Sequence, residues 1–148
     1  MNESEIKVFI SGVRRYFESI EPNATVVIEP PFIKDNGRQF LEYTGIIAIF
    51  GKARGAVCFT ANEPMLRQIL RLLEEDLADK EALCDLVGEI ANTLSGNARE
   101  EFGRDFMISV PVVSVGGDVK YPFPGGTRNY VIPIIWHSET AYLLICLT

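Results

Sequence analysis

Residues 83–103 carry the most regular alternation of apolar and polar positions in the chain. At about 100° per residue, six apolar positions fall on one side of a helix: Leu83, Leu86, Val87, Ile90, Leu94 and Ala98. The nearly opposite side is polar and carries Asp85, Glu89, Asn92, Gly96 and Arg99. This pattern predicts an amphipathic helix with its apolar stripe in the core and its polar face in water. The helix is expected to begin near Asp79 and to end at Gly103, a residue type that suits a helix exit.

Two further helices are predicted. Residues 3–20 place apolar side chains at helical spacing, and Pro22 and Asn23 end this segment. A shorter helix begins near Asn62, a good N-cap, with Pro64 tolerated in its first turn. Its expected buried face consists of Met65, Leu66, Ile69, Leu70 and Leu73. The charged residues 74–80 then form a solvated link to the central helix.

Six runs rich in β-formers predict strands within residues 25–29, 40–50, 56–60, 107–115, 130–136 and 141–147. Pro30-Pro31 confines the first run to a sheet edge or breaks it, and Ser109-Val110-Pro111 interrupts another edge strand. Asp35-Asn36-Gly37 suits a hairpin turn, Gly45 a bulge, and residues 137–140 the turn of a last hairpin.

These elements predict an α/β (α+β) protein. We expect one domain over residues 1–148, with three helices packed on a mostly antiparallel sheet of about six strands. No linker, low-complexity segment or clear internal repeat is visible in the sequence.

Composition narrows the possible partners. The formal net charge is −6 and there is no basic run, so nucleic acid is not an expected partner. The first residues do not resemble a signal peptide, and no apolar run reaches the roughly 20 residues of a membrane span, so no membrane partner is expected either. Cys58, Cys84 and Cys146 lie in apolar surroundings. They are expected to be buried thiols in a reducing compartment, which favours the cytoplasm.

Most candidate sites have an ordinary structural explanation. Gly125-Gly126-Thr127 lacks the spacing, the lysine and the following helix of a phosphate-binding loop, so a plain turn is the better interpretation. His137 is the only histidine and falls in the last predicted turn. It has no nearby cysteine with which to form a zinc site, so no metal site is predicted.

Glu89 and Asn92 are the remaining candidates. They are three residues apart and project as neighbours from the polar face of the central helix. Gly88 and Gly96 each destabilise the helix by roughly 1 kcal/mol relative to alanine. Their presence is explained if the helix needs a surface without side chains on which a partner can dock closely. The competing interpretation is an ordinary solvated face with two tolerated glycines.

The neighbours of this pair add specificity. The string Asp85-x-x-Gly88-Glu89-x-x-Asn92-x-x-x-Gly96-Asn97-Ala98 resembles the signature helix of the CheX/CheC family of chemotaxis phosphatases. The resemblance extends in order from the first helix to the strand at Ile108 to Pro111 and the terminal hairpin. CheC-type members carry two signature helices, whereas the first helix here, FISGVRRYF, has no E-x-x-N, so the chain looks like CheX.

The resemblance implies a function. The substrate would be the aspartyl phosphate of a CheY-like receiver domain, with Glu89 paired to the receiver lysine and Asn92 holding the attacking water. The receiver would supply Mg²⁺, so this chain needs no cofactor. Beyond the resemblance, we infer from the polar face and the two glycines that Asp85, Gly88, Gly96 and Arg99 form the docking surface.

Two other functions remain open. One is a non-catalytic receiver-binding or scaffold module of the same fold, and the other is a small-molecule sensor that uses residues 121–126. CheX-type relatives also resemble dimers joined through their sheets. We therefore expect a symmetric homodimer through a β-edge, with the apolar run Ala141 to Leu147 as the candidate edge and the Glu89–Asn92 face left free.

Overall fold

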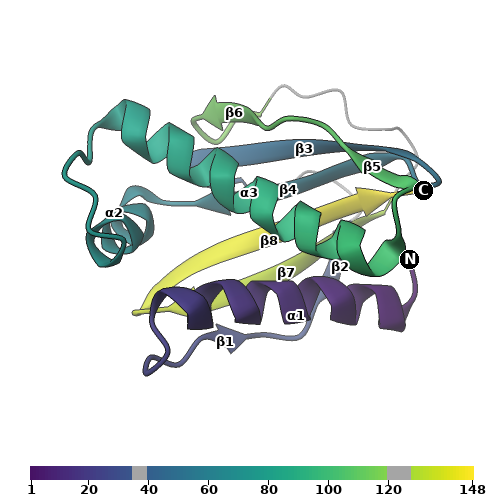
Figure 1. Ribbon diagram of the computed structural model, residues 1–148, viewed down its shortest axis with the longest axis horizontal. Helices are drawn as coiled ribbons and strands as arrows, with labels where there is room; N and C mark the ends of the chain where they lie inside the picture. Colours follow the sequence, from purple (N-terminus) through teal and green to yellow (C-terminus); the bar gives the residue numbers. More distant parts are fainter. Residues whose placement is uncertain (35–39, 120–127) are drawn as a thin grey trace.

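The computed structural model describes residues 1–34, 40–119 and 128–148, which form three helices on one sheet (Figure 1). The helices are α1 (Glu3–Ile20), α2 (Glu63–Leu72) and α3 (Lys80–Phe102). The sheet has eight strands: β1 (Val27–Ile28), β2 (Phe32–Lys34), β3 (Tyr43–Gly51), β4 (Gly55–Ala61), β5 (Phe106–Ile108), β6 (Val112–Val115), β7 (Asn129–Trp136) and β8 (Glu139–Leu147). All the strand pairs are antiparallel, so the predicted α+β class is confirmed.

The sheet has eight strands rather than about six because each edge strand is split in two. On one edge, β1 and β2 both pair with β7 and are separated by Pro30-Pro31. On the other edge, β5 and β6 both pair with β3 and are separated by Ser109, Val110 and Pro111. Proline has no N–H to give to a ladder, so it is tolerated at edges and interruptions. The interruption at Ser109 to Pro111 was predicted from the sequence, and Pro30-Pro31 was predicted to mark an edge or a break, but strand β2 after these prolines was not predicted.

The sheet order β1-β7-β8-β4-β3-β5 reveals an internal repeat. Each half of the chain contributes a helix, a split edge strand and a hairpin: α1 with β1 to β4, and α3 with β5 to β8. The edge strand of each half pairs with the first hairpin strand of the other half, and β4 meets β8 at the centre. Helix α2 is inserted between the halves. The sequence shows no clear repeat, but the structure contains one.

Three strand-level expectations are wrong. The run Ala141 to Leu147 is not an edge, because β8 lies between β7 and β4. The turn at residues 35–37 falls outside the described residues, but the strands that flank it do not form a hairpin, since β2 pairs with β7 and β3 with β4. Gly45 is not a bulge, because its pairing with Phe59 continues a regular register along β3 and β4.

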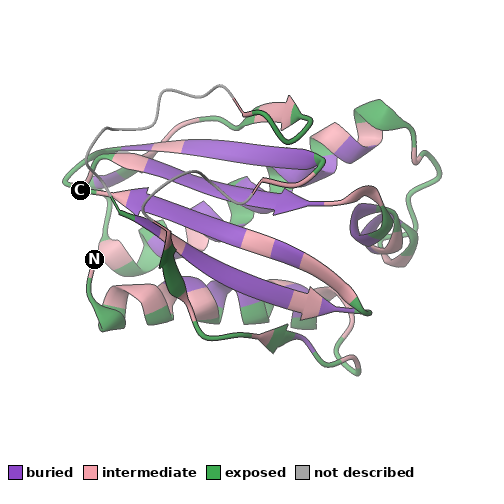
Figure 2. Cartoon of the chain, turned by 180° about the vertical axis from the view of Figure 1, so that it is seen from behind, coloured by how far each residue is buried: buried purple, intermediate pink, exposed green. Residues whose placement is uncertain are grey.

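Gly45 instead allows close packing of a helix on the sheet. A Cβ atom at this position would lie 2.4 Å from the Val87 carbonyl oxygen and 3.0 Å from the Ala91 Cβ atom of α3. Helices α1 and α3 lie side by side on this face of the sheet (Figure 1). Between the helices and the sheet is the main core, in which the Phe17 and Trp136 rings are 5.3 Å apart. From the other side, the central strands are buried along most of their length (Figure 2).

The helix ends follow the local sequence. Asn2 and Glu5 form a reciprocal capping box at the start of α1. The predicted cap Asn62 begins α2, but its side chain accepts a hydrogen bond from the Glu42 N–H instead of capping the helix. Cys58 and Cys146 are buried and Cys84 is partly buried. In the described ranges, no helix is both long and apolar enough to cross a membrane.

Candidate functional site

Helix α3 is fixed by its cap and by its buried stripe. The Asp79 side chain accepts a hydrogen bond from the Ala82 N–H at 2.9 Å, and Gly103 ends the helix with a φ of 99°. The six stripe residues predicted from the sequence are all buried. Gly88, Ala91 and Ser95 are buried beside them. The rotation of α3 about its axis is therefore set by contacts with β3, β4, β5 and β6 on one side.

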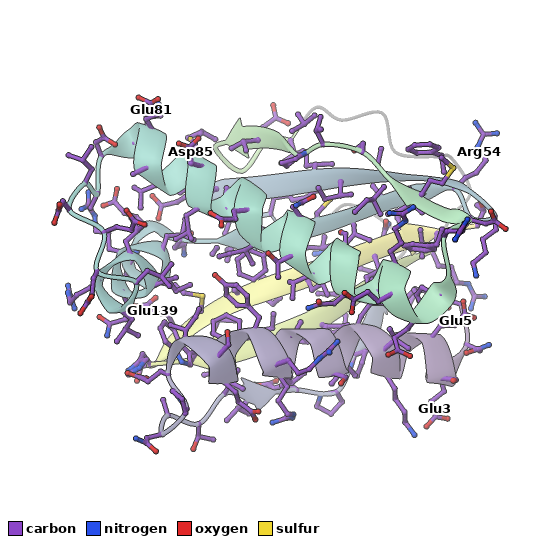
Figure 3. The ribbon with its side chains drawn as sticks, in the orientation of Figure 1. Glu3, Glu5, Arg54, Glu81, Asp85 and Glu139 are labelled. Atoms are coloured by element: carbon purple, nitrogen blue, oxygen red, sulfur yellow. The ribbon has the colours of Figure 1, made fainter. Side chains whose placement is uncertain are left out.

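The outer face of α3 carries the candidate residues. Asp85, Glu89, Asn92 and Arg99 are exposed, and Gly96 is partly exposed. Figure 3 shows Asp85 with Glu81 on the N-terminal part of α3, at the end of the molecule where α2 lies. Neither the Glu89 side chain nor the Asn92 side chain makes a hydrogen bond or an ion pair with any described residue. A carboxylate and a carboxamide thus face solvent about one helical turn apart, with their hydrogen-bonding capacity unused.

Gly88 does not belong to this outer face, contrary to the sequence-based expectation. It is buried, and an added Cβ atom would lie 3.1 Å from Val113 Cγ2 and 3.4 Å from Pro111 Cβ. Its function is to let the β5–β6 segment pack beside α3. Gly96 matches the expectation, because an added Cβ atom there would meet no described atom within 4 Å.

Arg99 lies at the C-terminal end of the same face. Its Nη2 donates to the Arg104 carbonyl oxygen at 3.4 Å, and its own carbonyl accepts from the Gly103 N–H at 2.9 Å. Its guanidinium therefore lies close to the chain that leaves α3. Because the cation sits near the negative end of the helix dipole, this placement also stabilises the helix terminus.

Tyr16 of α1 is a neighbour of the site that the sequence analysis missed. Burial raises the pKa of the Tyr16 phenol, and the Glu89 carboxylate raises that pKa further. The phenol therefore stays neutral and adds no negative charge next to Glu89. The signal was not visible in the sequence because Tyr16 and Glu89 belong to different helices, which pack closely where Gly12 faces Asn97.

Among the described residues, the other candidate positions do not form a second site. His137 is exposed in the β7–β8 turn with a φ of 49°, and its ring contacts the Glu21 carboxylate, so the surface-turn interpretation is confirmed. Over the part of the chain that the structure describes, no group of three or more His, Cys, Asp or Glu side chains is arranged to hold a metal ion. Gly125, Gly126 and Thr127 lie outside the described residues.

Comparisons with known proteins agree on the fold. The family model described as chemotaxis phosphatase CheX matches residues 43–135, more than half of the chain. A CheC-like superfamily protein from Shewanella has a TM-score of 0.83 at 24% identity, with 100% of this chain and 99% of that chain covered. A chemotaxis protein CheX from Desulfovibrio desulfuricans has a TM-score of 0.84 at 21% identity, with 98% and 99% covered.

A third solved structure includes a partner. It is a CheX–CheY–BeF₃–Mg²⁺ complex from Borrelia burgdorferi, which is similar to this chain with a TM-score of 0.76 at 16% identity and 96% of both chains covered. No curated protein sequence matches the chain. At these identities the solved structures establish a shared fold, and the family match rests on the sequence model.

Proposed function

Because the chain belongs to the CheX family of chemotaxis phosphatases, we propose that it hydrolyses the aspartyl phosphate of a CheY-like receiver domain. The observation that carries this proposal is the pair of exposed and unengaged side chains, Glu89 and Asn92, on the outer face of α3. The complex of a CheX with CheY from Borrelia burgdorferi supports the choice of partner.

Glu89 has a docking role in this proposal. A carboxylate is repelled by a phosphoryl group, since like charges raise the energy of approach. It is attracted to a cation, and the active-site lysine of a receiver is such a cation. The cross-interface pair Glu89–lysine would hold α3 over the receiver's phosphorylation site. Burial and the Glu89 carboxylate both raise the pKa of the Tyr16 phenol, so Tyr16 stays neutral and adds no second negative charge beside Glu89.

Asn92 has the catalytic role. It is uncharged, so it can enter the site of a phosphoryl group without repulsion, and it offers one acceptor oxygen and two donor hydrogens. It would accept a hydrogen bond from a water molecule and hold that water in line with phosphorus. Positioning of this kind supplies most of the rate in phosphoryl transfer, because the transition state needs orientation and charge stabilisation rather than covalent help.

The receiver would supply the remaining chemistry. Its aspartyl phosphate is the substrate, and its Mg²⁺ would balance the charge on the phosphoryl oxygens. This chain would contribute no cofactor. Asp85, Gly96 and Arg99 would surround the docking point on the outer face, while Gly88 is excluded from that surface by its burial. A CheY-like partner also favours a cytoplasmic location.

Substitution of Asn92 tests the catalytic assignment. We expect Asn92→Ala to lower kcat for receiver dephosphorylation by about 100-fold or more, a loss typical for removal of one preorganised polar group, with unchanged receiver binding and an unchanged circular dichroism spectrum. Thr93→Ala is the matched control, because Thr93 is exposed on the same turn. Wild-type turnover by Asn92→Ala would remove Asn92 from the mechanism. A wild-type chain that binds receivers without turnover would instead be the non-catalytic module.

Glu89→Gln tests the docking pair, because it keeps the shape of the side chain and removes its charge. Exposed ion pairs contribute about 0–1 kcal/mol, so we expect a rise in the Kd for the phosphorylated receiver of up to about fivefold at low salt. The rise should shrink as salt screens the pair. Equal binding by wild type and Glu89→Gln at low salt contradicts the lysine pairing.

We also propose a homodimer, now through the β6 edge. Val110, Val112 and Val115 are exposed along this edge, at 79%, 51% and 46%. Among the described strands β6 pairs only with β3, and an apolar edge of this kind favours pairing with a second chain. Light scattering should then give twice the chain mass of 16.5 kDa at micromolar concentration. Val112→Lys should yield a monomer that retains turnover, whereas a wild-type mass of one chain rules this dimer out.

A further inference from the structure

The surface next to Glu89 is hollowed between α2 and α3. This groove has a volume of about 270 Å³, and we call it the α2–α3 groove. Its apolar part is formed by Leu70 of α2, by Leu73 and Leu77 of the connection, and by Ala82 and Leu86 of α3. Leu70 and Leu86 are almost fully buried, but Leu73 and Leu77 are 46% and 68% exposed. Two leucine side chains thus face water inside a concave surface.

The polar part of the groove is acidic. Glu75, Asp85 and Glu89 are the charged residues among those that line it, and none of the lining residues is basic. Asp85 lies at this end of α3 in Figure 3. Glu74 and Asp76 flank Glu75 along the chain and add to the negative charge of this segment. An apolar floor with a rim of one charge sign fits an apolar side chain that is flanked by cations.

The groove is continuous with the proposed docking surface. Glu89 belongs to both, and Asp85 lies one turn before it on α3. A receiver whose lysine meets Glu89 would therefore also cover this groove. A single exposed leucine on a protein surface needs no explanation. Here, however, two exposed leucines lie in a groove that shares Glu89 with the docking surface. A partner docked on that surface would bury both of them.

We propose that the α2–α3 groove is a second contact for the phosphorylated receiver and the part of the interface that selects the cognate receiver. It binds one apolar side chain from a receiver segment that also carries lysine or arginine. This inference rests on the proposed function, since the occupant is the same partner that Glu89 and Asn92 engage. Receivers with an acidic residue at the matching position are rejected by Glu75 and Asp85, because like charges are brought together.

Asn92 and the α2–α3 groove would affect different kinetic parameters. Asn92 acts on the phosphoryl group, so its loss lowers kcat. The groove acts on affinity alone, so its loss raises KM and leaves kcat unchanged. Buried apolar anchors near a charged rim commonly supply much of the binding free energy of an interface. The groove could therefore matter more for affinity than the exposed Glu89 pair.

The test uses a Mg²⁺-loaded, beryllofluoride-activated CheY-like receiver as the binding probe, together with turnover of the phosphorylated receiver. Leu77→Ser removes an exposed anchor without a core cavity, since Leu77 is 68% exposed. We expect its Kd to rise about tenfold, the value of one buried leucine side chain, with kcat at saturation unchanged. Val27→Ser is the control, because Val27 is 48% exposed on β1 at the far edge of the sheet (Figure 1).

The rim is tested independently by Asp85→Lys, which should raise the Kd at low salt and lose this effect at high salt. A Kd for Leu77→Ser within twofold of wild type, with an unchanged thermal melt, overturns the groove inference while wild-type turnover leaves the phosphatase proposal standing. If the wild-type protein binds the probe but does not hydrolyse the phosphorylated receiver, the phosphatase proposal is overturned. The Kd of Leu77→Ser for the probe then still tests the groove inference. Wild type that binds no receiver overturns both.

Discussion

The inner and outer faces of α3 differ in how much space each leaves for a side chain. The inner face packs tightly against the sheet. A Cβ atom on Gly45 of β3 would lie 2.4 Å from the Val87 carbonyl oxygen of α3, and one on Gly88 of α3 would lie 3.1 Å from Val113 Cγ2 of β6. On the outer face, a Cβ atom on Gly96 would meet nothing within 4 Å. The same residue type therefore permits tight packing on one side of the helix and leaves an open surface on the other. Substitutions should damage the fold on the inner face and receiver recognition on the outer face.

Gly45→Ala should have the largest effect on stability. The new methyl group would overlap a backbone carbonyl that cannot rotate away, so α3 would have to move from the sheet. We expect the free energy of unfolding to fall by about 3 kcal/mol, at the upper end for overpacking, as measured by urea denaturation. Gly96→Ala is the matched control and should raise stability by roughly 1 kcal/mol. An unchanged urea midpoint for Gly45→Ala would show that the contact is not tight.

Ser95→Ala should stabilise the inner face. The Ser95 hydroxyl is 0% exposed, and in the described part of the chain it has no hydrogen-bond partner. Removing an unsatisfied buried hydroxyl and adding a better helix former should raise the free energy of unfolding by about 1 kcal/mol. The check is a higher urea midpoint with an unchanged m-value. A fall in stability would indicate a buried water or another partner for the hydroxyl.

Among these substitutions, Gly96→Leu should change the free energy of unfolding the least, and it tests the outer face. It should raise the free energy of unfolding by about 0.5–1 kcal/mol through helix propensity. The same side chain would obstruct the docked receiver, and we expect kcat/KM to fall about tenfold. Stability and activity would then change in opposite directions. A destabilised Gly96→Leu protein would place Gly96 in the interior and contradict the assignment of the outer face.

Local periodicity was sufficient for most of the elements. The helices at residues 3–20 and 80–102 and the six apolar runs were all predicted close to their observed bounds. The partners of the strands were not, because pairing depends on contacts far apart in the sequence. Ala141 to Leu147 illustrates the point: a nearly continuous apolar run is typical of a strand with both faces covered. That property fits the observed central position of β8 better than the predicted edge.

The sequence predicted the part of the candidate site that lies on the outer face of α3. The helical wheel placed Glu89, Asn92 and Gly96 on the outer face, and the structure has them there. The wheel could not place Gly88, which lies at the flank of the stripe, because its burial depends on β6 packing beside α3. Tyr16 and Leu77 were missed for the same reason, since each comes from another segment of the chain.

The meeting of β4 and β8 at the centre of the sheet has a consequence for how the chain folds. Gly55 lies opposite Leu147, so the middle of the sheet closes only when residues from both halves are present. At a synthesis rate of about 5–20 residues per second, the segment between these strands takes roughly 4–15 s to emerge. During that time β4 has an unpaired edge that can join other chains. Such long-range pairing is also typical of slow folding, on the millisecond-to-second scale. Folding intermediates of this chain should therefore be prone to aggregation, and should depend on chaperones more than the helices alone would suggest.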